Sequence, residues 1–164
     1  MSAGIISQPQ EAMGNFVREH LGLNEGSRWG EYRTLGLVRN SALAGAVVYN
    51  HFSQYSCCAH IAGLPGKMWM TPEFLYAIFD YPFNGMKLQR ITGLVPERNE
   101  RAAKFDEHLG FKYEGKMRNA LPDGEGLLVY GMLKEECRWI SEEFSTKVYK
   151  RLMMRYGSSS STLH

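Results

Sequence analysis

An asparagine at a strand-to-helix junction is the polar residue of this sequence whose position most favours chemistry. Asn99 lies in RITGLVPERNERAAKFDEHLGF, where a strand-like run ends at Pro96 and a helical pattern follows. An asparagine at such a junction can accept hydrogen bonds from the free N–H groups of the first helical turn. The same side-chain amide could instead contact a bound ligand. The residues alone leave both roles open, and the cap is the commoner of the two.

The three cysteines do not form a metal-binding or disulfide pattern. Cys57 and Cys58 are neighbours in a strand-like run, so their side chains would point to opposite faces of a sheet. No Cys-x-x-Cys spacing is present, and Cys137 is distant in the sequence. We therefore expect no metal site and a protein that works in a reducing compartment.

Length and composition indicate one soluble domain. A chain of 164 residues has room for one domain with a proper core and little more. Its 44% apolar content is ordinary for a globular protein, and its net charge of +2 gives no basic field for nucleic acid. No segment approaches the ~20 apolar residues that span a bilayer. The N-terminus lacks the pattern of a signal peptide. The sequence therefore predicts a cytoplasmic protein with no membrane partner.

Periodicity and capping signals predict the elements that position these residues. The expected strands are Tyr32–Arg39, Ala42–Phe52 and Tyr55–Gly63, successive and antiparallel, then Gln89–Val95, and a hairpin of Lys112–Ala120 and Leu127–Leu133. The expected helices are Pro9–Leu21, a second that starts at Thr71-Pro72 and extends to about Phe83, and Asn99–Leu109. This order predicts an α/β (α+β) domain with a mixed, mostly antiparallel sheet flanked by helices.

The last predicted element is a long amphipathic helix from Arg138 to Tyr156 with a basic second half. The apolar residues that recur every four positions are Ile140, Phe144, Val148, Leu152 and Tyr156. This stripe could pack on the domain itself, pair with a second copy or dock on another protein. We predict a domain over residues 1–137, this helix over 138–156 and a flexible tail over 157–164.

The segment from Arg90 to Arg118, with the late strand LLVYGMLKEE, resembles the GNAT superfamily of acetyl-CoA-dependent N-acetyltransferases. It is most similar to the branch that acetylates ribosomal-protein N-termini. The features that carry the resemblance are the strand, Asn99 at the junction, the small residue three positions on, and the LGF that ends the helix before EG. The resemblance covers roughly Gly36 to Lys134. The segments FDYPFN and VYGML also resemble sequences from tailed-bacteriophage genomes.

The resemblance implies a splayed sheet whose parted strands admit the pantetheine arm of acetyl-CoA. The third strand and Gln89–Val95 would separate, and Asn99 would lie beside the arm. The loop before the Thr71 helix would hold the pyrophosphate on its backbone N–H groups. The implied cofactor-binding residues are Ile61, Ala62, Gly66, Lys67, Met68, Trp69, Met70, Thr71, Asn99, Ala102 and Phe105. Met68 and Met70 stand where the family has glycines, and Glu73 places a negative charge nearby.

Three residues are catalytic candidates under this resemblance. His60, near the end of the third strand, has an ordinary pKa suited to a general base, and Glu114 is the carboxylate alternative. Many family members use a tyrosine to protonate the departing thiolate of CoA. The matching residue here is Asp106, and an ionised aspartate has no proton to give. Tyr130 is the candidate substitute.

The resemblance implies direct transfer of acetyl from acetyl-CoA to a primary amine of an unidentified acceptor. For a phage-encoded protein the compartment would be the host cytoplasm or the virion. The alternative is a catalytically degenerate interaction or structural module on the same fold, such as a virion or assembly component. Its partner would be a second copy or another protein bound through the 138–156 helix. That helix has five basic and two acidic residues, a net charge of +3, which an ordinary solvated face explains without nucleic acid.

Overall fold

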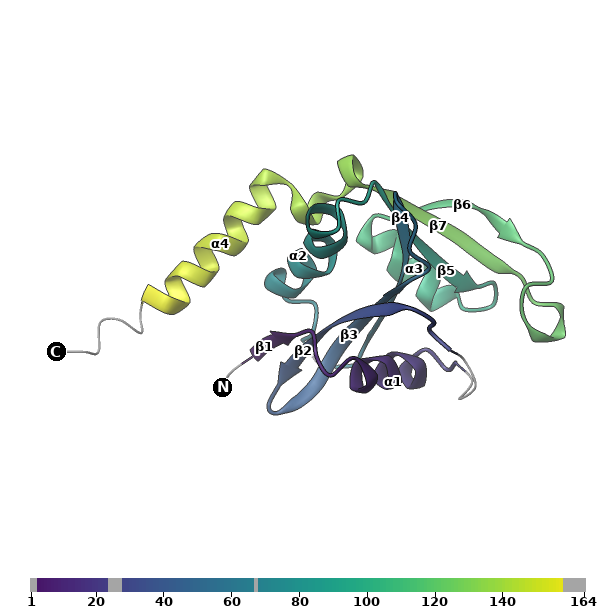
Figure 1. The fold of residues 1–164 in the computed structure, drawn as a ribbon, viewed down its shortest axis with the longest axis horizontal. Coiled ribbons are helices and arrows are strands. Elements are labelled where there is room, and N and C mark those ends of the chain that lie inside the picture. Colours follow the sequence, from purple (N-terminus) through teal and green to yellow (C-terminus); the bar gives the residue numbers. More distant parts are fainter. Residues whose placement is uncertain (1–2, 24–27, 67, 158–164) are drawn as a thin grey trace.

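The computed structural model describes residues 3–23, 28–66 and 68–157, which form a seven-stranded sheet with helices on both faces (Figure 1). The strands are β1 (Ala3–Ile6), β2 (Tyr32–Arg39), β3 (Ala42–Asn50), β4 (Ser56–Gly63), β5 (Arg90–Pro96), β6 (Lys112–Met117) and β7 (Leu127–Leu133). The α-helices are α1 (Gln10–His20), α2 (Pro72–Asp80), α3 (Glu100–Leu109) and α4 (Glu142–Gly157). The strand order is β1-β2-β3-β4-β5-β7-β6.

The sheet splits between β4 and β5, its one parallel pair within the described residues. The two strands pair only where Ser56–Cys58 lies beside Arg90–Thr92, although β4 continues to Gly63 and β5 to Pro96. Each strand stays paired on its other edge, β4 with β3 and β5 with β7. Beyond the split, one edge of each strand therefore carries backbone groups with no neighbouring strand.

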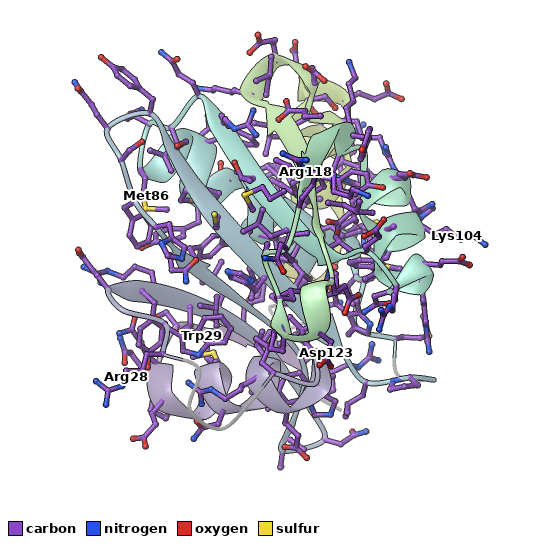
Figure 2. All side chains as sticks on the ribbon, turned by 90° about the vertical axis from the view of Figure 1, so that its right-hand side faces the viewer. Arg28, Trp29, Met86, Lys104, Arg118 and Asp123 are labelled. Carbon is purple, nitrogen blue, oxygen red and sulfur yellow. The ribbon has the colours of Figure 1, made fainter. Side chains whose placement is uncertain are left out.

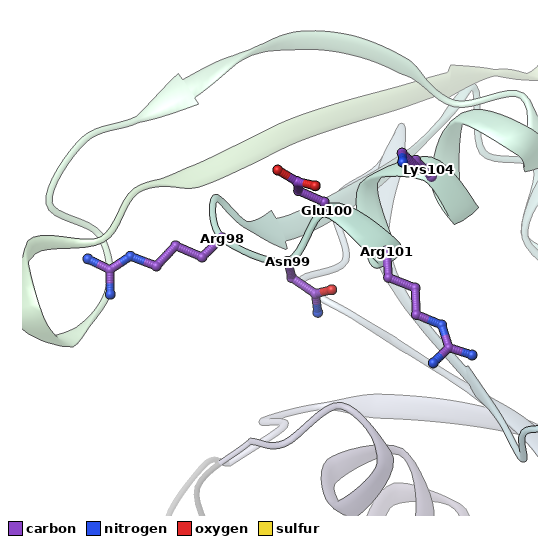
Figure 3. Close-up of a pocket in the computed structure, with 5 residues that line it drawn as sticks. All are labelled: Arg98, Asn99, Glu100, Arg101 and Lys104. Carbon is purple, nitrogen blue, oxygen red and sulfur yellow. The ribbon is translucent and has the colours of Figure 1, made fainter.

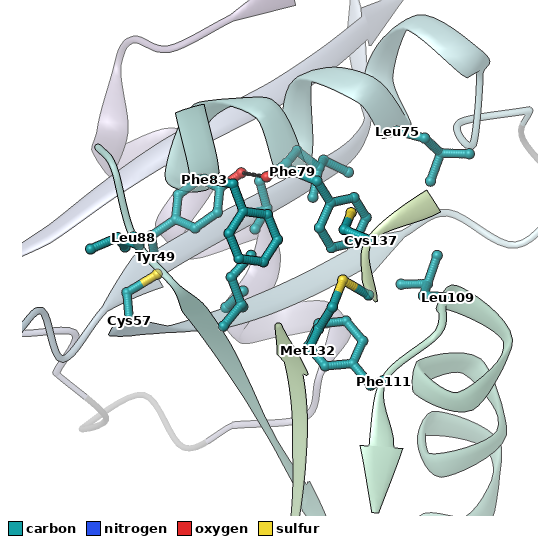
Figure 4. Close-up of a cluster of buried hydrophobic side chains, with 14 of the residues drawn as sticks. Tyr49, Cys57, Leu75, Phe79, Phe83, Leu88, Leu109, Phe111, Met132 and Cys137 are labelled. Atoms are coloured by element: carbon teal, nitrogen blue, oxygen red, sulfur yellow. Dashed lines mark hydrogen bonds between the residues drawn. The ribbon is translucent and has the colours of Figure 1, made fainter. Parts of the chain in front are cut away.

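The larger core cluster lies between the sheet and helices α2 and α3 (Figure 4). Phe79 of α2 and Leu109 of α3 are almost fully buried in it. Tyr49 of β3 donates its hydroxyl to the carbonyl of Ile78 at 2.6 Å, which ties the sheet to α2. Burial raises the pKa of Tyr49 well above its ordinary value, so the hydroxyl stays protonated. This cluster fixes α2 and α3 on the same face of the split sheet.

Helix α1 covers the other face of β2, β3 and β4. Met13 and Val17 are fully buried there, together with Ala46. A Cβ atom added to Gly36 of β2 would lie 2.6 Å from the sulfur of Met13, so a glycine at this position lets the helix approach the sheet closely. The α1 helix therefore closes one side of the β2–β4 half of the sheet.

Most of the expected elements are present near their predicted bounds. Thr71 accepts a hydrogen bond from the N–H of Phe74 at 3.2 Å, and Pro72 is the first residue of α2, as predicted. Two elements differ from the prediction. Strand β1 was not predicted, because four mostly exposed residues give no readable period. Strand β6 is shorter than predicted, because Asn119 takes a φ of 53° and begins the turn.

The C-terminal helix is also shorter than predicted. A 3₁₀ turn covers Arg138–Ile140, and the hydroxyl of Ser141 then accepts from the N–H of Phe144 at 3.2 Å to begin α4. Val148 is 4% exposed against the domain, whereas Tyr156 is 70% exposed. The stripe therefore packs through its first half, and α4 extends away from the domain in Figure 1. No helix in the described part of the chain is long and apolar enough to cross a membrane. Beyond residue 157, the predicted tail lies outside the described residues.

Candidate functional site

A cavity of about 430 Å³ opens at the split between β4 and β5. Its walls come from the end of β4, the segment that leads to α2, the first turns of α3 and the end of α1. Eight of the residues that the sequence placed at a cofactor line it: Ile61, Ala62, Gly66, Trp69, Met70, Asn99, Ala102 and Phe105. Met68 and Thr71 line a neighbouring cavity instead, and Lys67 lies outside the described residues.

Asn99 is the N-cap of α3 and also lines this cavity. Its side-chain oxygen accepts a hydrogen bond from the N–H of Ala102 at 3.1 Å. Within the described residues no hydrogen bond occupies its amide nitrogen. Figure 3 shows the side chains of Asn99 and Arg101 on the same side of the start of α3. The predicted cap is therefore confirmed, and the geometry leaves room for the ligand contact, which stays a prediction.

The indole of Trp69 bridges the two sides of the split. A Cβ atom added to Gly63 of β4 would lie 2.1 Å from this ring, and one added to Gly45 of β3 would lie 3.0 Å from it. Across the split, the ring centroid of Trp69 is 5.6 Å from that of Phe105 on α3. The two glycines therefore provide the space in which the indole lies. The sequence placed Trp69 in the cofactor loop but carried no local signal for this bridging position.

Positive charge gathers at the start of α3, next to the cavity. Arg98, Arg101 and Lys104 surround a hollow of about 540 Å³, with Glu100 as the acidic residue among them (Figure 3). Arg101 lines both this hollow and the cavity at the split. Figure 2 shows Lys104 on the outer side of the molecule. Sequence reasoning missed this group, although three basic residues within RNERAAK were a readable signal.

A half-buried carboxyl group, that of Asp106, lies where the split begins. A Cβ atom added to Gly93 would lie 2.7 Å from Oδ2 of Asp106 on α3. Gly93 is the first residue of β5 beyond the last β4–β5 pair, Cys58 with Thr92. Burial raises the pKa of Asp106 to about 7. The expectation that Asp106 is ionised and has no proton to give is therefore wrong near neutral pH, where both of its forms are present.

His60 lies on the opposite face of β4, beneath α1. Its Nε2 is 2.9 Å from Oδ1 of Asn50, and its ring centroid is 5.0 Å from that of Trp29. Burial lowers the pKa of His60 to about 4, with a smaller contribution from the nearby His51. The imidazole is therefore neutral at pH 7, and it is a weaker base than an exposed histidine.

Glu114 is held by an arginine of β5. Arg90 donates to its two carboxylate oxygens at 3.0 and 2.6 Å, a bidentate pair. This hydrogen bonding keeps the pKa of Glu114 below its ordinary value. The carboxylate also lies over Gly131 of β7, because a Cβ atom added there would be 2.5 Å from Oε1 of Glu114. Glu114 is thus ionised and engaged in an ion pair.

Tyr130 lies on the same face of the sheet as Asp106. It is the register partner of Gly93, and its hydroxyl donates to Oε1 of Glu107 on α3 at 3.0 Å. Burial, together with the neighbouring Glu107, raises the pKa of Tyr130, so the hydroxyl is protonated at neutral pH. The candidate acids therefore gather on the α3 face, while the two candidate bases of the sequence lie on the other.

No protein-family model matches the sequence, and no curated protein matches it. Solved structures do match. A single-residue mutant of the spermidine N-acetyltransferase SpeG from Vibrio cholerae gives a TM-score of 0.67 at 16% identity, over 86% of this chain and 98% of that chain. A dodecameric structure of the spermidine N-acetyltransferase from Vibrio cholerae gives 0.65 at 16% identity, over 81% and 94%. A structure described as a putative acetyltransferase gives 0.60 at 20% identity, over 82% and 84%. The chain therefore has the GNAT fold, as predicted, with a C-terminal helix.

Proposed function

We propose that the protein is an acetyl-CoA-dependent N-acetyltransferase that transfers acetyl directly to a primary amine. The observation that carries the proposal is the split between β4 and β5 with its cavity of about 430 Å³. The unpaired backbone edge of β4 can hydrogen-bond to the amides of a pantetheine arm, as it would to an added strand. The shared fold with structures named as acetyltransferases supports this assignment.

In this proposal the pantetheine arm lies between Ile61 of β4 and Phe105 of α3. Asn99 donates its amide nitrogen to a carbonyl of the arm while its oxygen continues to cap α3. The pyrophosphate lies near the segment from Gly66 to Thr71, with Arg101 on its other side. Trp69 then either shifts to make room for the arm or lies along it. Both arrangements change the present contact between the indole and Phe105.

The chemistry needs a proton donor for the leaving thiolate. The amine nitrogen attacks the thioester carbonyl carbon, the C–S bond breaks, and the sulfur takes the electron pair. We assign the proton that the sulfur receives to Asp106, which lies at the start of the split with a pKa of about 7. The amine gives its surplus proton to water, since His60 has a pKa of about 4 and Glu114 is paired with Arg90. Positioning of the amine next to the thioester then supplies the remaining rate acceleration.

Isothermal titration with acetyl-CoA, with CoA alongside, tests the binding step. We expect micromolar affinity, weakened at least about tenfold in Asn99→Ala. Asn99→Ser is the matched control for the cap, because serine also caps a helix but lacks the amide nitrogen. Weak binding in both variants assigns the effect to the amide, whereas weak binding in Asn99→Ala alone assigns it to the helix start. No heat and no thermal stabilisation at millimolar ligand would exclude the enzyme.

Mass spectrometry of acetyl transfer then identifies the acceptor class. Two of the three structural neighbours described above are named for spermidine, and the resemblance to the ribosomal-protein branch favours the N-terminal amine of a peptide. Incubation with acetyl-CoA and each amine in turn should give one product that is heavier by one acetyl group. Binding of acetyl-CoA without transfer of its acetyl group to either class of amine would point to another amine as the acceptor.

A non-catalytic module on the same fold is the second candidate, and the position of Trp69 favours it. An indole that bridges β4 and α3 occupies part of the space that a pantetheine arm would need. In that case Trp69 is a core residue, and its replacement by alanine lowers stability without exposing any affinity for CoA. Gain of CoA binding in Trp69→Ala would show that the indole only covers a working site.

A further inference from the structure

A second cavity, of about 520 Å³, lies between the start of α2 and the last turns of α4. Three arginines line it: Arg39 from β2, and Arg151 and Arg155 from α4. Glu73 is the one acidic residue among the lining residues, so three positive charges and one negative give a net charge of +2. The whole chain has the same net charge of +2. The cavity therefore concentrates positive charge that the composition as a whole does not show.

The acidic residue of this cavity is already engaged. Arg151 donates through Nε to Oε1 of Glu73 at 2.8 Å, and the Glu73 side chain is 12% exposed. Burial opposes ionisation of Glu73, but the hydrogen bond from Arg151 and the charge of Arg155 outweigh it and hold its pKa below the ordinary value. Glu73 thus stays ionised and offsets one of the guanidinium charges.

Arg39 is anchored at the opposite wall. Its NH1 group donates to the backbone carbonyl of Met68, which fixes the guanidinium beside the segment that leads to α2. One such bond uses a single N–H of the five that a guanidinium carries. Arg39 and Arg155 come from elements more than a hundred positions apart in the sequence, so the fold, and not a local basic run, brings them together.

We propose that this cavity binds a phosphate-bearing anion, held between Arg39 on β2 and the arginines of α4. The planar forks of arginine match the oxygens of a phosphate in pairs, and several such groups around one anion favour a dianion over a monoanion. Met70 and Tyr156 line the same cavity and give an apolar contact for the organic group that carries the phosphate. The basic half of α4 is then a binding wall.

The phosphate can come from two sources. Met70 lines both this cavity and the cavity at the split, so the phosphate end of acetyl-CoA could reach the arginines past this side chain. In that case the inference rests on the proposed acetyltransferase function and places α4 in its cofactor site. The other source is a separate phosphorylated ligand, and that case does not depend on the proposed function.

Titration of the full chain with inorganic pyrophosphate tests the cavity itself. We expect measurable binding that falls about tenfold in Arg155→Gln and weakens with added salt. Lys150→Gln is the matched control, because it removes one positive charge from α4 at a position that does not line this cavity. Arg151 is unsuitable for the test, because its loss would also break the ion pair that it forms with Glu73. Absence of pyrophosphate binding, or equal losses in Arg155→Gln and Lys150→Gln, would overturn the proposal.

Competition between ligands separates the two sources. If the phosphate belongs to the cofactor, CoA displaces pyrophosphate. In that case Arg155→Gln weakens the binding of CoA but not that of pantetheine, which has no phosphate. If the ligand is separate, pyrophosphate binds equally well with and without CoA. Binding of pyrophosphate in this way without any affinity for CoA would support the anion site and exclude the acetyltransferase function. The two proposals can therefore fail independently.

Discussion

Replacement of Asp106 by asparagine should change how the stability of the protein depends on pH. The native state raises the pKa of Asp106 from 3.8 to about 7, because the carboxyl group packs against β5 and is partly removed from solvent. Between pH 3.8 and about 7, this carboxyl group is therefore protonated in the folded chain and ionised in the unfolded chain. At about 1.4 kcal/mol per pH unit this corresponds to about 4 kcal/mol of folding free energy.

The sign follows from proton binding. A carboxyl group whose pKa is raised on folding contributes stability that is fully present below pH 3.8 and is lost as the pH rises to about 7. Asparagine has nearly the shape of a protonated aspartate and does not titrate. The stability of Asp106→Asn relative to the native sequence should therefore increase by up to about 4 kcal/mol between pH 4 and pH 8.

Urea denaturation at each pH, followed by circular dichroism, measures this difference. The comparison must be made between the two proteins, because His60 titrates in the same range with the opposite sign. Subtraction cancels His60 and every other group that both chains share. Parallel stability curves for the two proteins would refute the reasoning, since they would mean that Asp106 ionises in the folded chain as easily as in the unfolded one.

Three further perturbations test other parts of the structure. His60→Gln should reduce the loss of stability that occurs as the pH falls from 6.5 to 4, because folding lowers the pKa of His60 from 6.5 to about 4. Urea denaturation at pH 5 and pH 7 measures this effect, and an equal stability difference between variant and native sequence at both pH values would mean that the ring is exposed. Gly63→Ala should expel the indole of Trp69, destabilise the fold by about 1–3 kcal/mol and shift tryptophan fluorescence to the red; an unshifted spectrum would contradict the contact. Val148→Ala should cost about 1–2 kcal/mol in urea denaturation if α4 packs on the domain, whereas its exposed neighbour in Tyr149→Ala should change stability by less than about 0.5 kcal/mol; equal effects would contradict that packing.

The elements that could be predicted from the sequence are those whose boundaries depend on local chemistry. Thr71 before Pro72 and Asn99 before its helix both act as caps with their own side chains. Gly110 ends α3 at a φ of 107°, a conformation that favours glycine. Strand β1 depends on pairing with β2, a non-local contact, and its four residues show no periodic pattern that would predict a strand.

The site could be predicted only where it depends on the family pattern. Most of the expected cofactor residues line one cavity, and they come from two short segments, 61–70 and 99–105, that the family pattern places on the two sides of the split. The pKa of Asp106 depends instead on burial against Gly93, which belongs to another element. The room for Trp69 likewise depends on Gly63, and an isolated glycine in a strand does not reveal what lies over it. Such properties are tertiary and have no local signal.

The methionines of the segment before α2 are compatible with an anion site in this arrangement. Gly66 takes a φ of 70°, so glycine is retained at a position of that segment whose backbone favours it. Met68 is 78% exposed, and its bulk therefore lies at the surface and does not fill the segment's interior. Where glycine-rich segments surround a phosphate with backbone N–H groups, this chain places guanidinium groups of β2 and α4 beside the same segment. In the proposed site the charge that attracts an anion depends on Arg155 and Arg39, so methionine at positions 68 and 70 does not by itself exclude anion binding.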